Sequence, residues 1–112
     1  MNWNGSKWIR PEKRLAIYIR DQFRCLACGR DLRNADPVEI NLDHLVPRAK
    51  GGSNKASNLA TTCKRCNCAR GAKRWTKFYP VENHASVRKT IRRKLNVKLA
   101  KALILGETNL IF

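Results

Sequence analysis

CLACG, residues 25–29, and CKRC, residues 63–66, each place two cysteines three positions apart. Each pair can present two thiolates to one ion, and four thiolates complete a closed tetrahedral zinc site. A redox role is the alternative for either pair taken alone. The remaining cysteine, Cys68, falls outside this spacing, and we expect its thiol not to be a ligand. The pattern therefore predicts one structural zinc ion that joins two distant parts of the chain, bound by Cys25, Cys28, Cys63 and Cys66.

The net charge indicates a polyanionic partner. Lys and Arg number 24 against 8 Asp and Glu, which gives a formal net charge of +16 over 112 residues. Neutralisation of phosphates by Lys and Arg drives non-specific binding to nucleic acid, so nucleic acid is the leading candidate. Solubility alone is the alternative explanation. The length predicts a single domain over residues 1–112, and we expect a C-terminal helical extension at about 83–106.

Membrane association is not expected. No apolar run approaches the roughly 20 residues that a spanning helix needs. Residues 1–13, MNWNGSKWIRPEK, lack the apolar segment of a signal peptide. We therefore expect a cytoplasmic protein, in a reducing compartment where cysteines bind metal rather than form disulfides.

Helices and strands follow from apolar periodicity and from turn residues. Pro11 favours the start of a helix whose apolar positions recur every three or four residues and which ends before Cys25. Residues 38–46, VEINLDHLV, alternate loosely and predict a strand, and a second short strand is expected at about 59–62. The stretch between them is a loop by composition, with glycines at 51 and 52. Residues 63–74 are compatible with a helix.

A longer basic helix is expected near the C-terminus. It starts at Asn83 or Ser86, either of which can cap it, and ends at Gly106. Its apolar stripe comprises Val87, Ile91, Leu95, Leu99 and Ala102. Arg88, Lys89, Arg92, Arg93 and Lys101 lie mostly elsewhere on its surface. The stripe predicts packing on the core, and the basic face is either solvated or follows a nucleic-acid backbone.

An acid and a histidine, Asp43 and His44, are adjacent between the two cysteine pairs, and Asn58 and Asn67 follow. Oxygen and imidazole groups suit a hard ion such as Mg²⁺ or Mn²⁺. Neighbouring strand residues point to opposite faces, so the acid can hold an ion while the histidine activates a water. The alternative is a surface pair that closes a turn.

Three segments in this order resemble the HNH endonuclease family in its zinc-stapled form: CLACG, LDHLVPRAKGGSNKASNL and CKRCNCARGAK. The likeness covers about residues 12–74, which it implies are the core of the domain. It implies an α+β fold built on a ββα-metal unit, in which a hairpin packs on a helix with the catalytic ion between them. It also implies a metal-dependent DNA endonuclease that hydrolyses phosphodiester bonds with one catalytic ion.

The resemblance assigns a role to each motif residue. Asp43 corresponds to the metal-binding acid, and His44 to the general base. Asn58 corresponds to the residue that orients the base across the loop. Asn67 stands where the family more often has a histidine ligand, and its amide oxygen suits Mg²⁺ or Mn²⁺.

Basic side chains around these motifs are expected to contact DNA, namely Arg48, Lys50, Arg70, Lys73, Arg88 and Arg92. A solvated helix face is the alternative for Arg70 and Lys73. We expect Trp3, Trp8 and Trp75 to cap a small core rather than stack on bases, and His84 to lie at the surface. Beyond DNA, expected partners are other subunits of a phage or mobile-element machine, and the chain is expected to be a monomer or homodimer. A zinc-stapled module that binds nucleic acid without cutting it is the alternative function.

Overall fold

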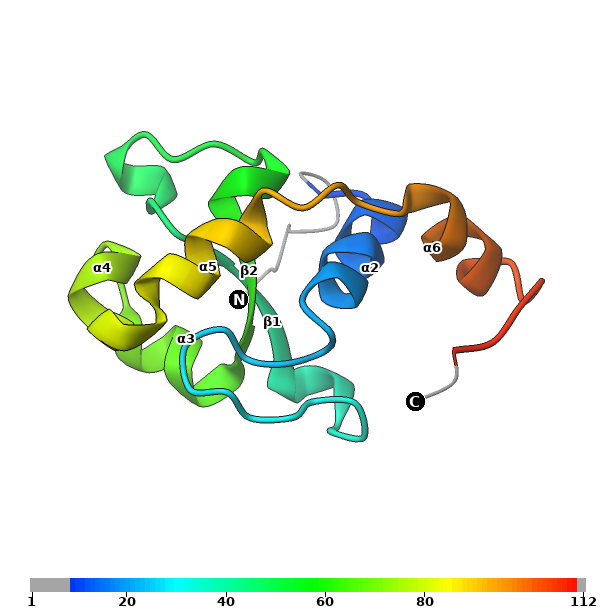
Figure 1. Cartoon of the computed structure of the whole chain (residues 1–112), viewed down its shortest axis with the longest axis horizontal. Coiled ribbons are helices and arrows are strands. Elements are labelled where there is room, and N and C mark those ends of the chain that lie inside the picture. The colour runs from blue at the N-terminus through cyan, green and yellow to red at the C-terminus, as the bar shows by residue number, and fades with distance from the viewer. Residues whose placement is uncertain (1–8, 111–112) are drawn as a thin grey trace.

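The computed structural model of the chain describes residues 9–110 (Figure 1). Trp3 and Trp8 lie outside these residues, so their expected positions are not described. No helix between residues 9 and 110 is long and apolar enough to cross a membrane. The helices and strands, in chain order, are α2 (Pro11–Arg20), η1 (Pro37–Glu39), β1 (Ile40–His44), η2 (Arg48–Lys50), η3 (Ala56–Asn58), β2 (Leu59–Cys63), α3 (Lys64–Arg70), α4 (Trp75–Phe78), η4 (Val81–Asn83), α5 (His84–Ile91) and α6 (Val97–Ile104).

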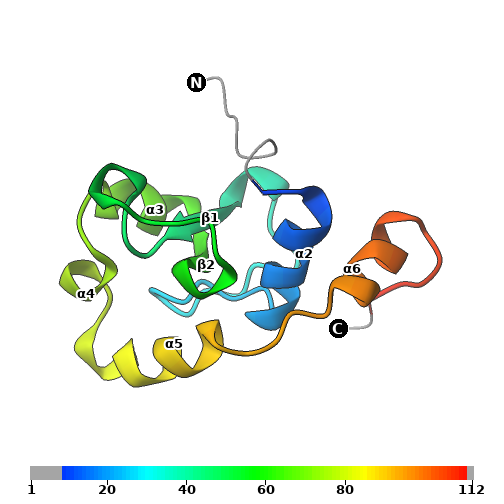
Figure 2. The same ribbon diagram turned by 90° about the horizontal axis from the view of Figure 1, so that it is seen from above.

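The centre of the fold is an antiparallel hairpin of β1 and β2, in which His44 lies opposite Leu59 and Asp43 opposite Ala60. Helix α2 packs on β2, and α3 packs on both strands. Figure 2 shows the hairpin between these two helices. Every residue of β2 is buried, as expected for a strand that is covered on both faces. The architecture is α+β and is consistent with a ββα-metal unit.

The first strand is shorter than residues 38–46. Its N-terminal part is instead the turn of η1, because the Asp36 side chain accepts a hydrogen bond from the Val38 N–H at 3.0 Å and Pro37 favours this start. The second strand is confirmed and extends to Cys63. The helix expected over residues 63–74 ends at Arg70, since Gly71 with a φ of +58° leaves the helical conformation.

The prediction of a single C-terminal helix is wrong. Helices α5 and α6 are separated by residues 92–96, and the Asn96 side chain caps α6 by accepting from the Leu99 N–H at 3.0 Å. Leu95, in the break, packs against a buried cluster formed by Ile9, Ile17 and Leu59. The break has a packing reason, because it lets α5 cover the cysteine cluster through Val87 while α6 packs on α2.

A buried ion pair ties these pieces together. Arg20, at the end of α2, pairs with Asp21 at 2.7 Å and donates to the carbonyls of Ala56, Leu59 and Ile91 at 2.9, 2.6 and 3.3 Å. Asp21 also accepts from the Thr61 N–H of β2 at 2.8 Å. One guanidinium therefore joins α2, the hairpin and the end of α5.

Replacing this arginine by methionine is expected to cost about 3–5 kcal/mol of unfolding free energy, because Asp21 would keep a buried charge without its partner. The measurement is urea unfolding of Arg20→Met beside Arg10→Met, a matched change at an exposed position. The control should stay within about 0.5 kcal/mol of the parent. Equal midpoints for the two variants would show that the pair does not hold the fold together.

Candidate active site and metal centre

Four sulfurs meet where the first cysteine pair packs on the end of β2. The Sγ atoms lie within 4.8 Å of one another, and Cys28 Sγ is 3.9 Å from Cys63 Sγ. Thiolates about 2.3 Å from a tetrahedral zinc ion are about 3.8 Å apart, so this spacing fits. In each pair the second cysteine's N–H points at the first sulfur, at 3.4 Å for Cys28 to Cys25 and 3.5 Å for Cys66 to Cys63. Cys68 is exposed and outside the group, as expected.

The electrostatics of the cluster favour a bound cation. Burial opposes ionisation of Cys63, but hydrogen bonds from Cys66 and the neighbouring sulfurs lower its pKa to about 7. Burial raises the pKa of Cys25, and burial together with the Cys63 sulfur raises that of Cys66. Burial and mutual repulsion therefore oppose several thiolates side by side, and a cation bound among them would offset this. The four cysteines fit a structural metal site.

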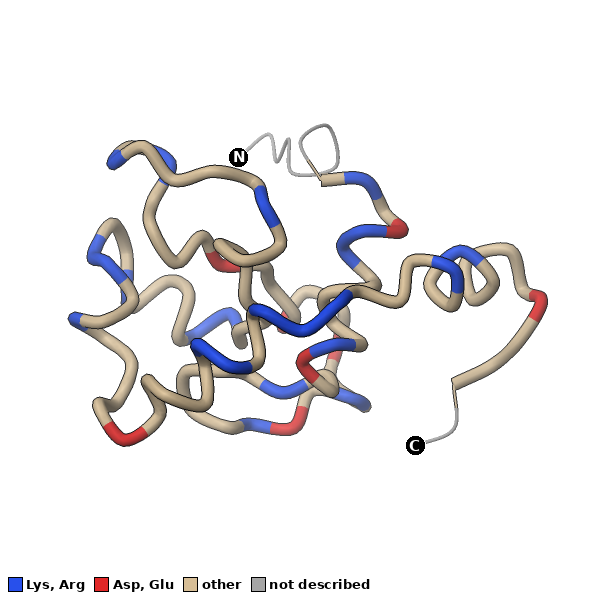
Figure 3. Tube along the Cα trace, turned by 45° about the horizontal axis from the view of Figure 1, so that its top comes forward, with Lys and Arg blue, Asp and Glu red and all other residues tan. Residues whose placement is uncertain are grey.

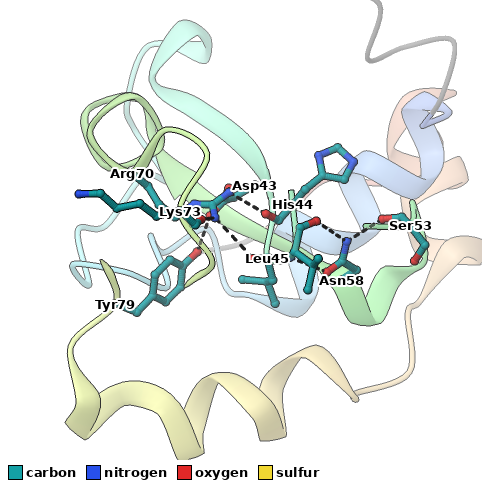
Figure 4. Close-up of polar contacts among 9 residues, drawn as sticks. Asp43, His44, Leu45, Ser53, Asn58, Arg70, Lys73 and Tyr79 are labelled. Carbon is teal, nitrogen blue, oxygen red and sulfur yellow. Dashed lines mark hydrogen bonds and ion pairs between the residues drawn. The ribbon is translucent and has the colours of Figure 1, made fainter. Parts of the chain in front are cut away.

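Asp43 lies on the face of β1 that meets α3 and is only 1% exposed. Its carboxylate forms an ion pair with Arg70 and accepts the Tyr79 hydroxyl at 2.9 Å (Figure 4). Burial raises the pKa of Asp43, and the Arg70 and Tyr79 contacts oppose this rise. Burial and the adjacent carboxylate raise the pKa of Tyr79 far above its usual range, so its hydroxyl keeps its proton and donates a hydrogen bond to Asp43.

The expected surface position of Arg70 is not observed. The side chain is 4% exposed and donates to the carbonyls of His44 at 2.6 Å, Leu45 at 3.4 Å and Lys73. Helix α3 packs on the hairpin, and its last residue, Arg70, faces Asp43. The Arg70 side chain therefore joins the end of α3 to β1. Sequence reasoning also missed Tyr79, which follows α4 in a stretch, KFYPV, that carries no recognisable motif.

His44 lies on the opposite face of β1 and is half-buried. Figure 4 shows its ring pointing away from the Asp43 carboxylate, as strand alternation predicts. Its Nε2 atom is 2.7 Å from the side-chain oxygen of Asn54. Asn54 was not identified from the sequence, because it is one of several polar residues in a loop without periodicity.

Asn58 fixes the loop that begins directly after His44. Its side-chain oxygen accepts from the Val46 N–H at 2.9 Å, and its Nδ2 donates to the carbonyls of Val46 and Ser53 at 3.1 and 2.8 Å. A Cβ atom at Gly52 would lie 1.7 Å from the Val46 oxygen, so only glycine fits at this crossing. The loop is therefore held closed by one amide and by one close backbone approach.

Asn67 is half-buried on α3, one helical turn before Arg70. Residues three apart share a helix face, so Asn67 is on the side of α3 that faces Asp43. Its side chain makes no hydrogen bond to another residue between 9 and 110. A carboxylate and an amide oxygen have the donor chemistry that Mg²⁺ and Mn²⁺ prefer. The Asp43 carboxylate is occupied by Arg70 in this structure, so an ion and Arg70 would compete for it.

A family model described as HNH endonuclease matches residues 25–78. These residues belong to the HNH endonuclease family. The chain is also 32% identical over 78 residues to the CRISPR-associated endonuclease Cas9 of Corynebacterium diphtheriae. That match covers 66% of this chain but 7% of the relative, so the chain spans only a small part of that protein. No match was found among the solved structures.

The matched HNH segment contains both cysteine pairs, the hairpin, α3 and α4. Most basic residues expected to contact DNA are exposed on or beside it: Arg48, Lys50, Lys73, Arg88 and Arg92. Figure 3 shows Lys and Arg along the hairpin loop, the α3–α4 connection and α5.

Trp75 packs on the core, as expected, and the Arg88 guanidinium lies 5.2 Å from its ring centre. His84 is half-buried at the start of α5, with Nε2 2.9 Å from the Tyr79 carbonyl oxygen.

Proposed function

We propose that the protein is a metal-dependent DNA endonuclease that hydrolyses phosphodiester bonds. The observation that carries this proposal is the placement of His44 and Asp43 on opposite faces of one strand, beside a loop fixed by Asn58, inside an HNH segment. We further propose that residues 1–112 act as one domain and that zinc is the structural metal at the four cysteines.

In this mechanism His44 removes a proton from the attacking water, and the water oxygen forms a bond to phosphorus. The bond between phosphorus and the leaving oxygen breaks, and the leaving oxygen takes a proton from solvent. Asp43 and Asn67 would hold Mg²⁺ or Mn²⁺, which when bound supplies positive charge to the phosphate oxygens. Asn58 keeps the strand end and the loop in register, so that His44 stays at one place on the surface.

The positive charge of Arg70 affects metal binding at Asp43. It neutralises the carboxylate that would bind the ion, so the ion and Arg70 compete for Asp43. A guanidinium released from a carboxylate finds an equivalent acceptor in a DNA phosphate. We therefore propose that Arg70 contacts a DNA phosphate in the complex.

One observation favours a second candidate function. The pairing of Asp43 with Arg70 and Tyr79 is what a purely structural buried acid would show. In that case the protein is a zinc-stapled module that binds DNA without cutting it.

A plasmid assay separates the two functions. Purified protein is incubated with supercoiled plasmid and Mg²⁺, Mn²⁺ or no added divalent ion, and nicked and linear products are separated on a gel. The nuclease is expected to convert the plasmid only when an ion is added. Unchanged plasmid under all three conditions, with DNA binding intact, would support the binding module instead.

DNA affinity is expected to fall steeply with salt, by about 10³–10⁵ between 50 and 200 mM for six to ten phosphate contacts. The measurement is fluorescence anisotropy with a labelled duplex and no added divalent ion. Lys50→Ala and Arg92→Ala should each lower the log–log slope by about one. Arg30→Ala is the matched control, because Glu39 already neutralises Arg30 at 3.0 Å. A shallow slope in the parent would contradict the expected electrostatic binding.

A further inference from the structure

We propose that Asn54 is the residue that positions His44 for proton transfer, a role that rests on the proposed nuclease function. The Asn54 side-chain oxygen lies 2.7 Å from His44 Nε2, across the long loop that joins the two strands. This contact joins the His44 ring to the loop. The family resemblance links Asn58 to the base, but the Asn58 amide forms its hydrogen bonds with the backbone of Val46 and Ser53.

The Asn54 contact has chemical consequences for the ring. An amide oxygen only accepts hydrogen bonds, so the ring nitrogen facing it must carry the proton. The neutral imidazole is then the Nε2–H tautomer, and its lone pair is on Nδ1. Nδ1 is therefore the atom that receives the proton from water. The hydrogen bond also fixes the rotation of the His44 ring about its Cβ–Cγ bond.

Asn54 is itself held from two directions. Lys13 of α2 donates from Nζ to the Asn54 carbonyl at 2.6 Å. On the other side, the preceding residue, Ser53, is bound through its carbonyl by Asn58 at 2.8 Å. Helix α2 lies before the segment 25–78 that the family model matches. The N-terminal helix thus supports the base from outside the matched segment.

The chain offers an internal control for a spectroscopic test, because His44 and His84 are its two histidines. His84 Nε2 faces the Tyr79 carbonyl at 2.9 Å, and a carbonyl also only accepts. Both rings are therefore expected as Nε2–H tautomers with protected ring protons. The 112-residue protein is labelled with ¹⁵N-histidine, and long-range ¹H–¹⁵N spectra are recorded at a pH where both rings are neutral.

Two substitutions separate positioning from structure. Asn54→Leu removes the acceptor at similar size, and Asn54→Asp keeps an acceptor oxygen. In Asn54→Leu the His44 ring proton should lose protection and both tautomers should appear, while the His84 signals stay unchanged. Plasmid nicking by this variant should show kcat lowered about ten- to hundredfold with little change in KM, the scale known for partners that orient metal-bound histidines. Asn54→Asp should restore the protected Nε2–H and most of kcat.

Asn34→Leu is the matched control, since Asn34 is exposed on the turn before η1 and should leave spectra and kcat as in the parent. An Nδ1–H tautomer of His44 in the parent would overturn the inference. So would an active Asn54→Leu variant with the parent's kcat, whatever its spectra. A parent that cuts no plasmid would instead overturn the proposed function, and the positioning role with it, even if the ring spectra show the hydrogen bond.

Discussion

Cys63→Ser is expected to lose both its bound metal and its native fold. Cys63 ends β2 and caps α3, so its sulfur joins the hairpin, the helix and the first cysteine pair. Zinc binding at such sites contributes about 10–16 kcal/mol, which is as large as the about 5–15 kcal/mol that stabilises a whole domain. Elemental analysis should find about one zinc per parent chain and almost none in the variant. Far-ultraviolet circular dichroism should show the loss of helix.

Cys68→Ser is the matched control, because Cys68 is exposed and lies outside the four-sulfur group. It should keep the zinc content and the melting temperature of the parent. A folded parent without metal, or a Cys63→Ser variant as stable as the parent, would show that packing alone holds the two cysteine pairs together. Prolonged dialysis against a chelator provides a second route to the same comparison, since it removes the ion without changing the sequence.

The parts of this fold that could be predicted are those with a regular spacing. The paired cysteines indicated the four-sulfur group, and the turn residues at 51 and 52 separated two strands that do pair. The C-terminal break could not be foreseen from the periodic stripe, because Leu95 continues the stripe and yet packs on a different cluster. The position of α2 in three dimensions decides where Leu95 packs, and the sequence pattern does not show that position.

The site shows a similar division. Strand alternation correctly put Asp43 and His44 on opposite faces. The contacts of each side chain depended on long-range packing instead. Arg70 turns inward because α3 ends against β1, and Tyr79 reaches Asp43 only because α4 folds back over the cluster. Asn54 reaches His44 because Lys13 and Asn58 shape the loop from both sides. None of these contacts has a local sequence signal.

His44→Ala is expected to lower the rate of plasmid cleavage by about two to four orders of magnitude while DNA affinity stays close to that of the parent. The side chain is half-buried at the strand end, opposite Leu59, and its removal takes away the proton acceptor without touching the Asp43 network. Single-turnover nicking of supercoiled plasmid measures the rate, and anisotropy without added divalent ion measures the affinity. His84→Gln is the matched control at the other histidine and should cut at nearly the parent rate.

Added metal ion then separates the base from the ligand. Asp43→Asn keeps an oxygen donor but loses the negative charge, so its cleavage should recover in part as Mg²⁺ or Mn²⁺ is raised. No ion concentration should rescue His44→Ala, because the missing group accepts a proton and does not bind the ion. Should His44→Ala cut as fast as the parent, the adjacent acid and histidine only close a turn. The buried pairing of Asp43 with Arg70 would then be its whole role, and the protein would be a DNA-binding module.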